Sequence, residues 1–178
     1  MERRKWLGKV FIGTSVDGFI ARESGDIDWL TSRGEAAGDT GYDAFMAGID
    51  HLVMGRVTYE TVLEFGFWPY EGKTVLVLST TLAPDDPRVR VVRSIAKARD
   101  VLDGAARGVY VDGGQVVQAF LREDLIDEIT ITRVPVLIGV GKPLFGTLPT
   151  DVDLELLEQR TLGGGVVQTR YRVRLAAA

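Results

Sequence analysis

The sequence predicts an α/β protein of three layers, with a mostly parallel central sheet and an antiparallel hairpin at its C-terminal end. Uninterrupted apolar runs, such as residues 52–54 and 74–78, are typical of strands buried on both faces. Segments with helical spacing lie between these runs, and this alternation favours a parallel sheet. The last two segments, residues 154–161 and 166–175, alternate apolar and polar residues on both sides of three glycines, which predicts an antiparallel hairpin.

The first third of the chain is expected to contain two strands and three helical segments. Residues 1–8 are basic without a long apolar stretch, so they are expected to form a disordered lead-in and not a signal peptide. Residues 9–16 are β-branched and apolar, which predicts the first strand. A short helical turn is expected at residues 26–31 and a helix at residues 42–49. The apolar run at residues 51–55 predicts a strand, and a helix is expected directly after it at residues 56–65.

The remainder of the chain repeats the alternation of strand and helix. Residues 74–78 form a fully apolar strand, and two prolines mark an irregular link to a short strand at residues 89–92. Ser94 is a favourable N-cap for a helix at residues 95–102. A core strand at residues 108–111 precedes a helix at residues 115–122. Residues 126–134 alternate as a strand does, and residues 135–138 extend them.

Bulk properties limit the classes of protein that fit. The length of 178 residues suits one domain, residues 1–178, with a sizeable core. A net charge of -4 argues against a nucleic-acid partner. The chain has no cysteine and no metal-binding cluster of the HExxH kind, so we expect no disulfide and no metal site. No apolar stretch approaches the roughly 18 residues needed to cross a membrane, and we expect a cytoplasmic protein.

Chemically useful residues gather where the predicted strands end. In an open α/β sheet, ligands bind beyond the carboxyl ends of the strands. Gly55 lets the chain turn, and Arg56 and Thr58 then open a helix. Free N–H groups, a helix dipole and a guanidinium at one point predict an anion site, and phosphate is the expected anion. The other strand ends are Val16-Asp17-Gly18, Ser79-Thr80 and Asp112-Gly113-Gly114.

In this order and spacing, the motifs resemble the dihydrofolate reductase superfamily, which includes the reductase domain of riboflavin biosynthesis. The resemblance covers residues 9–175. The motifs that carry it are Met54-Gly55-Arg56-x-Thr58-x-Glu60, Leu78-Ser79-Thr80, Asp112-Gly113-Gly114-Gln115-Val116, Ser15-Val16-Asp17-Gly18 and Pro135-x5-Gly141-x-Pro143-Leu144-Phe145.

The resemblance implies an NADPH-dependent reductase of the riboflavin type, which transfers a hydride to a small pyrimidine or pterin substrate. The residues that it assigns to the cofactor are Ile12, Gly13, Ile20, Gly55, Arg56, Thr58, Leu78, Ser79, Thr80, Gly113, Gly114, Gln115 and Val116. It places Trp29 and Phe45 at the substrate. It also suggests a homodimer, which the alternating strands of the hairpin would support.

The resemblance leaves four candidates for the proton donor. Folate-type enzymes carry one acid on the helix before the glycine-arginine strand. A direct count places that acid at Asp39, whereas aligning the helix aromatic at Phe45 places it at Asp43. Riboflavin-type enzymes instead match this chain at Asp17 and Asp112. A carboxyl half-buried beside a substrate ring would have its pKa raised toward neutrality, which suits a general acid.

Several alternatives remain open at the level of sequence. The chain fits dihydrofolate reductase proper, a non-catalytic NADPH-binding sensor or partner module, and a reductase of quinones or nitro compounds. NADH is an alternative to NADPH, because Arg56 has a possible role at the pyrophosphate. Trp68 and Tyr70 are equally consistent with substrate walls and with rim packing. His51, the only histidine, opens a predicted strand and is interpreted as structural.

Overall fold

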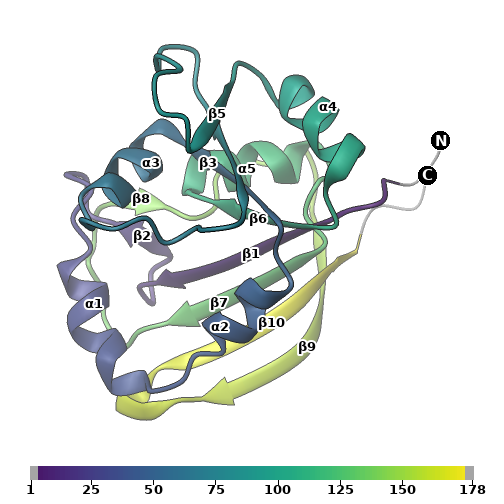
Figure 1. The fold of residues 1–178 in the computed structure, drawn as a ribbon. Coiled ribbons are helices and arrows are strands. Elements are labelled where there is room, and N and C mark those ends of the chain that lie inside the picture. Colours follow the sequence, from purple (N-terminus) through teal and green to yellow (C-terminus); the bar gives the residue numbers. More distant parts are fainter. Residues whose placement is uncertain (1–3, 175–178) are drawn as a thin grey trace.

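One eight-stranded sheet organises residues 4–174, the part of the chain that the computed structural model describes (Figure 1). Its strands, in order across the sheet, are β5 (Val89–Val92), β4 (Thr74–Leu78), β3 (His51–Gly55), β6 (Gly108–Asp112), β1 (Leu7–Thr14), β7 (Glu128–Arg133), β10 (Val167–Arg174) and β9 (Asp153–Thr161). The strands from β5 to β7 are parallel. β10 pairs antiparallel with both β7 and β9. The predicted parallel sheet with an antiparallel C-terminal hairpin is confirmed.

Helices cover both faces of the sheet, which confirms the predicted three layers (Figure 1). The helical elements are α1 (Asp28–Gly34), α2 (Tyr42–Ala47), α3 (Arg56–Leu63), α4 (Ile95–Ala105), α5 (Gly114–Arg122) and the 3-10 turns η1 (Glu35–Ala37) and η2 (Gly163–Gly165). On one face, Leu102 of α4 and Phe120 of α5 pack in the same core as Val10 of β1. On the other, Tyr59 of α3 packs in the same core as Met54 of β3.

The structure contains a second, two-stranded sheet that the sequence did not predict. It pairs β2 (Phe19–Ala21) with β8 (Lys142–Pro143), and the Leu144 N–H donates to the Gly18 carbonyl at 3.0 Å. These strands are too short to show a periodicity, and their pairing joins segments more than 100 residues apart. The small sheet ties the loop after β1 to the segment before Leu144, close to the start of α5.

The expectation of a disordered lead-in at residues 1–8 is wrong for residues 4–8, while residues 1–3 lie outside the described part of the chain. The Trp6 side chain is only 1% exposed, and its indole N–H donates to Asp103 at 2.7 Å. Arg4 forms an ion pair with Asp127, and β1 begins at Leu7. These partners are about 100 residues away in sequence, so no local pattern predicts them.

Other element boundaries moved by a few residues. The helix expected at residues 95–102 continues to Ala105, and the strand expected at residues 126–138 is limited to β7. The Ser94 cap is confirmed, because its hydroxyl oxygen accepts the Lys97 N–H at 3.2 Å. None of the helices in the described range is long and apolar enough to cross a membrane.

Replacing Ser94 with alanine is expected to lower the free energy of unfolding by about 1 kcal/mol, because the first turn of α4 loses its side-chain acceptor. Denaturation in urea would measure this change. Ser94→Asp keeps an acceptor at the same position and is the matched control, with near wild-type stability expected. Equal stability of Ser94→Ala and the wild type would show that the cap contributes nothing.

Candidate active site

Two helices begin side by side at the carboxyl edge of the sheet. β3 and β6 are neighbouring parallel strands, and they run directly into α3 and α5. The residues before these helices, Gly55 and Gly113, provide no side-chain cap. The first-turn N–H groups of both helices therefore remain available to an anion, and the two dipoles add at that point.

Glycine allows these two helix starts to approach each other closely. Gly113 has a φ of 92°, and a β-carbon there would lie 2.6 Å from the Thr58 hydroxyl oxygen. A β-carbon on Gly55 would lie 3.5 Å from a methyl group of Val116. Gly55 and Thr58 at the start of α3 thus lie against Gly113 and Val116 at the start of α5, although the two pairs are far apart in sequence. We call this arrangement of the two helix starts the glycine cradle.

The small sheet borders the glycine cradle. A β-carbon on Gly114 would lie 2.5 Å from the Pro143 carbonyl oxygen and 3.2 Å from the end of the Ile20 side chain. Ile20 therefore lies beside the start of α5. Gln115 occupies the first turn of the same helix with an exposed side chain.

Two arginines, Arg56 and Arg93, and the turn at Ser79-Thr80 follow the ends of β3, β5 and β4 at the same edge of the sheet. Arg56 is about half exposed, and its one polar side-chain contact within residues 4–174 is a long one, 3.4 Å, with Glu60. Leu78 is the register partner of Gly55, so Ser79 and Thr80 follow at the neighbouring strand end. Arg93, which the sequence analysis missed, donates to the Ser79 carbonyl at 2.8 Å. Its position just after a predicted strand was the available signal.

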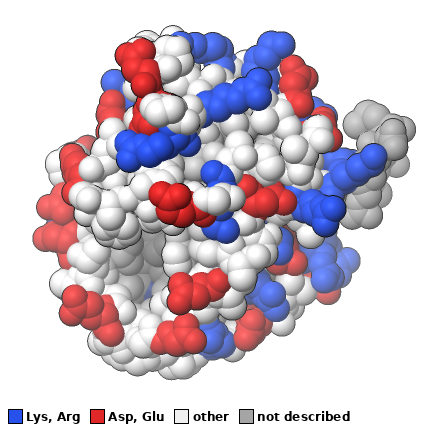
Figure 2. Space-filling view, viewed as in Figure 1, with Lys and Arg blue, Asp and Glu red and all other residues white. Residues whose placement is uncertain are grey.

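A cavity of about 440 Å³ lies between α1 and the sheet, and Figure 2 shows a hollow with largely uncharged walls on this face. Its lining residues are Phe11, Gly13, Leu30, Thr31, Gly34, Glu35, Ala37, Thr40, Thr132 and Val134. Gly13 of β1 is the register partner of Thr132 of β7, so the two form a floor. Ile12 alternates to the other face, where it packs against the core beneath α4 and α5.

Trp29 and Phe45, the predicted substrate residues, do not line this cavity, whereas residues next to them do. Trp29 is 2% exposed and packs in a small core with Val134 and Val166, while Leu30 and Thr31 line the cavity. Phe45 packs against Phe11, with ring centroids 4.9 Å apart, and Phe11 is the aromatic residue that reaches the cavity. Amphipathic spacing marks both Trp29 and Phe45 as inward-facing, but it does not say whether they face a core or a pocket.

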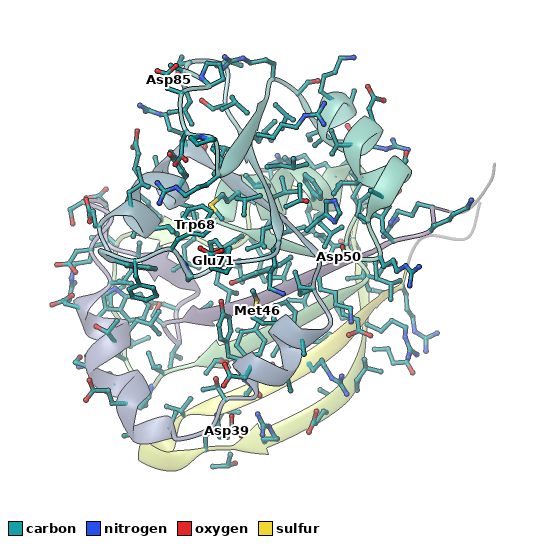
Figure 3. All side chains as sticks on the ribbon, in the orientation of Figure 1. Asp39, Met46, Asp50, Trp68, Glu71 and Asp85 are labelled. Carbon is teal, nitrogen blue, oxygen red and sulfur yellow. The ribbon has the colours of Figure 1, made fainter. Side chains whose placement is uncertain are left out.

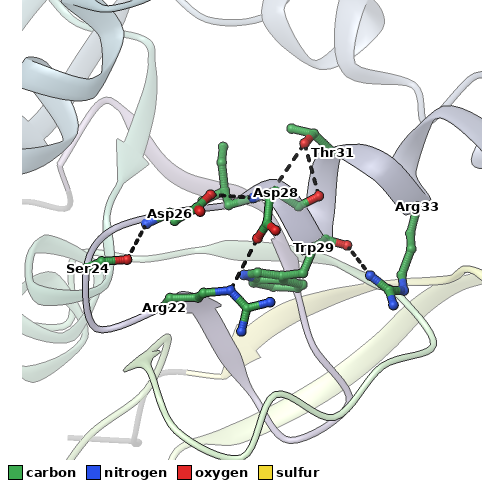
Figure 4. Close-up of polar contacts among 8 residues, drawn as sticks. Arg22, Ser24, Asp26, Asp28, Trp29, Thr31 and Arg33 are labelled. Carbon is green, nitrogen blue, oxygen red and sulfur yellow. Dashed lines mark hydrogen bonds and ion pairs between the residues drawn. The ribbon is translucent and has the colours of Figure 1, made fainter.

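Local hydrogen bonds hold the chain at the start of α1 (Figure 4). The Asp28 N–H donates to the Asp26 carboxylate at 2.8 Å, and the Arg22 guanidinium donates to the Asp28 carboxylate at 3.2 Å. Arg33 donates to the Trp29 carbonyl at 3.1 Å. These contacts fix the local conformation of the turn that leads into α1 and of the helix itself.

Three of the four candidate acids lie at the surface in turns or helix ends. The Asp17 carboxylate accepts the N–H of Gly139 at 2.8 Å, and hydrogen bonds from Ser15 and from this loop hold its pKa below the usual value. Asp39 accepts the Gly41 N–H at 2.8 Å and lies near the C-terminal hairpin (Figure 3). Asp43 is exposed in the first turn of α2. All three residues are exposed to solvent.

Asp112 differs from the others. It is the last residue of β6, it is half-buried, and burial raises its pKa to about 6 against a weaker opposing hydrogen bond from the Gly113 N–H. Burial and the charge of Asp112 together raise the pKa of Tyr42. The Tyr42 ring contacts Phe11, with centroids 5.6 Å apart, and Phe11 lines the cavity. Asp112 is therefore a carboxyl with a raised pKa on the same face of the sheet as the cavity, although it is not one of the lining residues.

The remaining aromatic and histidine candidates have structural surroundings. His51 lies at the amino end of β3 and contacts the Asp50 carboxylate at 2.7 Å, away from the strand ends that form the site. Tyr70 is buried in the core, and Trp68 packs between it and Arg88. Within residues 4–174, no group of three or more histidine and acidic side chains is placed to hold a metal ion.

Comparisons with known proteins agree with this architecture. Residues 8–168 match the family described as the RibD C-terminal domain. The uncharacterized protein YwjB of Bacillus subtilis is 38% identical over 93% of this chain and 96% of its own length. A solved structure from Shewanella sp. PV-4, whose name links it to riboflavin biosynthesis, is 39% identical with a TM-score of 0.86, over 95% of this chain and 99% of that one. Dihydrofolate reductase of Schistosoma mansoni, at 19% identity, shares the fold with a TM-score of 0.67 over 97% and 100% of the two chains.

Proposed function

This chain belongs to the family of RibD C-terminal domains, and we propose that it is an NADPH-dependent reductase of a small pyrimidine- or pterin-like ring. The observation that carries the proposal is the glycine cradle, in which two uncapped helix starts meet across Gly113 with an arginine beside them. A pyrophosphate needs this combination of N–H donors and positive charge.

The residues present fit the cofactor. The space that a β-carbon on Gly113 would fill lies against Thr58, where a phosphate oxygen can approach both the backbone and the hydroxyl. In our proposal, the amides at the start of α5 hold the pyrophosphate together with Thr58. Arg56, the turn after β4 and Arg93 hold the phosphate on the adenosine ribose. NADPH, when bound, supplies the hydride.

The other residues position and protonate the substrate. In our proposal, the cavity under α1 takes a flat ring, with Gly13 at its floor and the Leu30 side chain packed against that glycine. Asp112 is the acid that the structure favours as the proton donor, because its raised pKa keeps part of it protonated near neutral pH. Asp17 is engaged by backbone amides and holds its charge, which suits a structural role.

The direct test is a titration of the purified protein with NADPH, followed by the loss of NADPH absorbance in the presence of ring substrates. We expect saturable binding and turnover of at least one pyrimidine or pterin. Binding without any turnover would favour the non-catalytic sensor, and turnover of quinones alone would favour the third alternative. Absence of NADPH binding would refute the proposal.

Arg93→Gln is expected to weaken NADPH binding by about tenfold and to leave NADH binding unchanged, because a guanidinium near the turn at Ser79 contacts only the additional phosphate of NADPH. Dissociation constants for both cofactors would be measured by fluorescence titration. Arg90→Gln removes an exposed charge from the same strand segment and is the control. An equal loss for NADPH and NADH would place Arg93 outside the ribose phosphate site.

A further inference from the structure

A buried glutamine beneath the cavity makes a complete set of hydrogen bonds. Gln168 of β10 is 6% exposed, and its side-chain oxygen accepts from Arg160 of β9 at 2.6 and 3.2 Å. Its side-chain nitrogen donates to the Thr40 carbonyl at 3.0 Å and to the Thr132 hydroxyl oxygen at 2.8 Å. Two of these partners, Thr40 and Thr132, line the cavity.

The chemistry of these partners determines which way the amide points. A guanidinium only donates and a carbonyl only accepts, so the amide oxygen must face Arg160 and the amide nitrogen must face Thr40. The second N–H of Gln168 is then directed at Thr132. The Thr132 oxygen accepts this hydrogen bond, and its own proton must be donated elsewhere.

The Thr132 hydroxyl keeps a proton that it can donate to a ligand. The side chain is 8% exposed and lies on the cavity floor, and no acceptor for its hydroxyl proton is present among residues 4–174. Its register partner Gly13 has no side chain, and the Leu30 methyl groups lie 2.7 and 3.0 Å from where a β-carbon on Gly13 would be. A buried hydroxyl with an unused proton favours a ligand that brings an acceptor.

The charges around the cavity restrict the ligand further. None of the ten lining residues is lysine or arginine, and Glu35 is the only ionisable one among them. Arg160 and Arg33, from the neighbouring elements, donate to Gln168 and to the Trp29 carbonyl. A phosphate group in this cavity would meet a carboxylate and no cationic side chain among the lining residues, which is unfavourable.

On the basis of the proposed reductase function, we propose that the substrate enters this cavity as an unphosphorylated ring whose carbonyl oxygen accepts the Thr132 hydroxyl proton. Gln168 and Arg160 are positioning residues, because they act on the substrate only by setting the direction of that hydroxyl. The cavity thus selects a neutral carbonyl-bearing ring over its phosphorylated counterpart.

Calorimetric titration with a matched pair of ligands tests the choice between these substrates. The pair is 5-amino-6-(ribosylamino)uracil and its 5′-phosphate, which share the ring and differ only in the phosphate. We expect the unphosphorylated compound to bind at least about tenfold more tightly, with or without NADP⁺. Preference for the phosphate, or failure of both compounds to bind, would overturn the inference. Because NADP⁺ binding is titrated separately, its failure would count against the proposed function alone.

Variants at Thr132 test the hydroxyl. Thr132→Val keeps the shape and removes the donor, so affinity for the unphosphorylated ring should fall about tenfold, while Thr132→Ser should restore it. Thr130→Val, at an equally buried threonine on the same face of β7 outside the cavity lining, should bind normally. Equal binding by Thr132→Val and the wild type would refute the role of the hydroxyl.

A variant at Gln168 tests the relay. In Gln168→Glu the carboxylate accepts the Thr132 proton, so affinity should fall as it does in Thr132→Val. The double variant should lose no more than either single one, because both changes remove the same hydrogen bond. Additive losses would show that Gln168 acts on the cavity in another way. Thermal unfolding of each variant would confirm that the comparison is between folded proteins.

Discussion

Asp112→Asn is expected to lower the rate of substrate reduction at neutral pH by about 100-fold or more, with little change in NADPH affinity. A positioned general acid contributes an effect of this size, and an amide of the same shape cannot supply the proton. Asp112 lies at the end of β6 before the glycine cradle, so the substitution preserves the backbone that would hold the cofactor. Single-turnover reduction rates and NADPH titrations would separate the two effects.

The pH dependence of the wild-type rate supports or contradicts this assignment. The pKa of Asp112 is raised to about 6, so its protonated fraction falls as the pH rises through that value. The reduction rate should fall over the same range, and the Asp112→Asn variant should lose this dependence. If Asp17→Asn lowers the reduction rate and Asp112→Asn does not, the proton donor is Asp17 and the role of Asp112 is structural.

The same substitution, Asp112→Asn, is expected to stabilise the protein at neutral pH. A raised pKa means that the folded state binds the proton more tightly than the unfolded state, so stability is lost as the pH rises from about 4 to about 6. Removing the buried charge should raise the free energy of unfolding by about 2 kcal/mol at neutral pH, and by nothing below pH of about 4. Urea denaturation at both pH values would measure the difference. A destabilised variant at neutral pH would contradict the burial of a charged Asp112.

Gly113→Ala is the second change with a large expected effect. The φ of 92° strains any residue with a β-carbon, and that carbon would come within 2.6 Å of the Thr58 hydroxyl oxygen. We expect a loss of about 2 kcal/mol in the free energy of unfolding. NADPH affinity should fall about 100-fold, because the added carbon occupies the glycine cradle and separates the two helix starts.

Gly104→Ala provides the matched control. Gly104 lies inside α4, a β-carbon added there would have no atom within 4 Å, and the position is distant from the strand ends. Alanine there should stabilise the helix by about 1 kcal/mol and leave NADPH binding unchanged. Wild-type NADPH affinity in Gly113→Ala would show that the glycine cradle is not the pyrophosphate site.

Local pattern was sufficient to predict the layers of the fold. The apolar runs of β3, β4 and β6 are buried on both faces, so each reads as a strand without knowledge of its neighbours. The cap at Ser94 is equally local, because donor and acceptor are three residues apart. The motifs that indicated the family are also short and local. They follow strand ends, and a parallel sheet brings those ends to one edge.

The sequence by itself thus determined the sheet, its helices and the set of residues at its carboxyl edge. Only the tertiary structure decided which residues form a pocket and which form a core, as Trp29 and Thr132 show. It also distinguished Asp112 from the other three acids, because burial, and not residue type, raises its pKa. Burial and the hydrogen bonds of a hydroxyl depend on contacts between residues distant in sequence. A local sequence pattern does not predict such contacts.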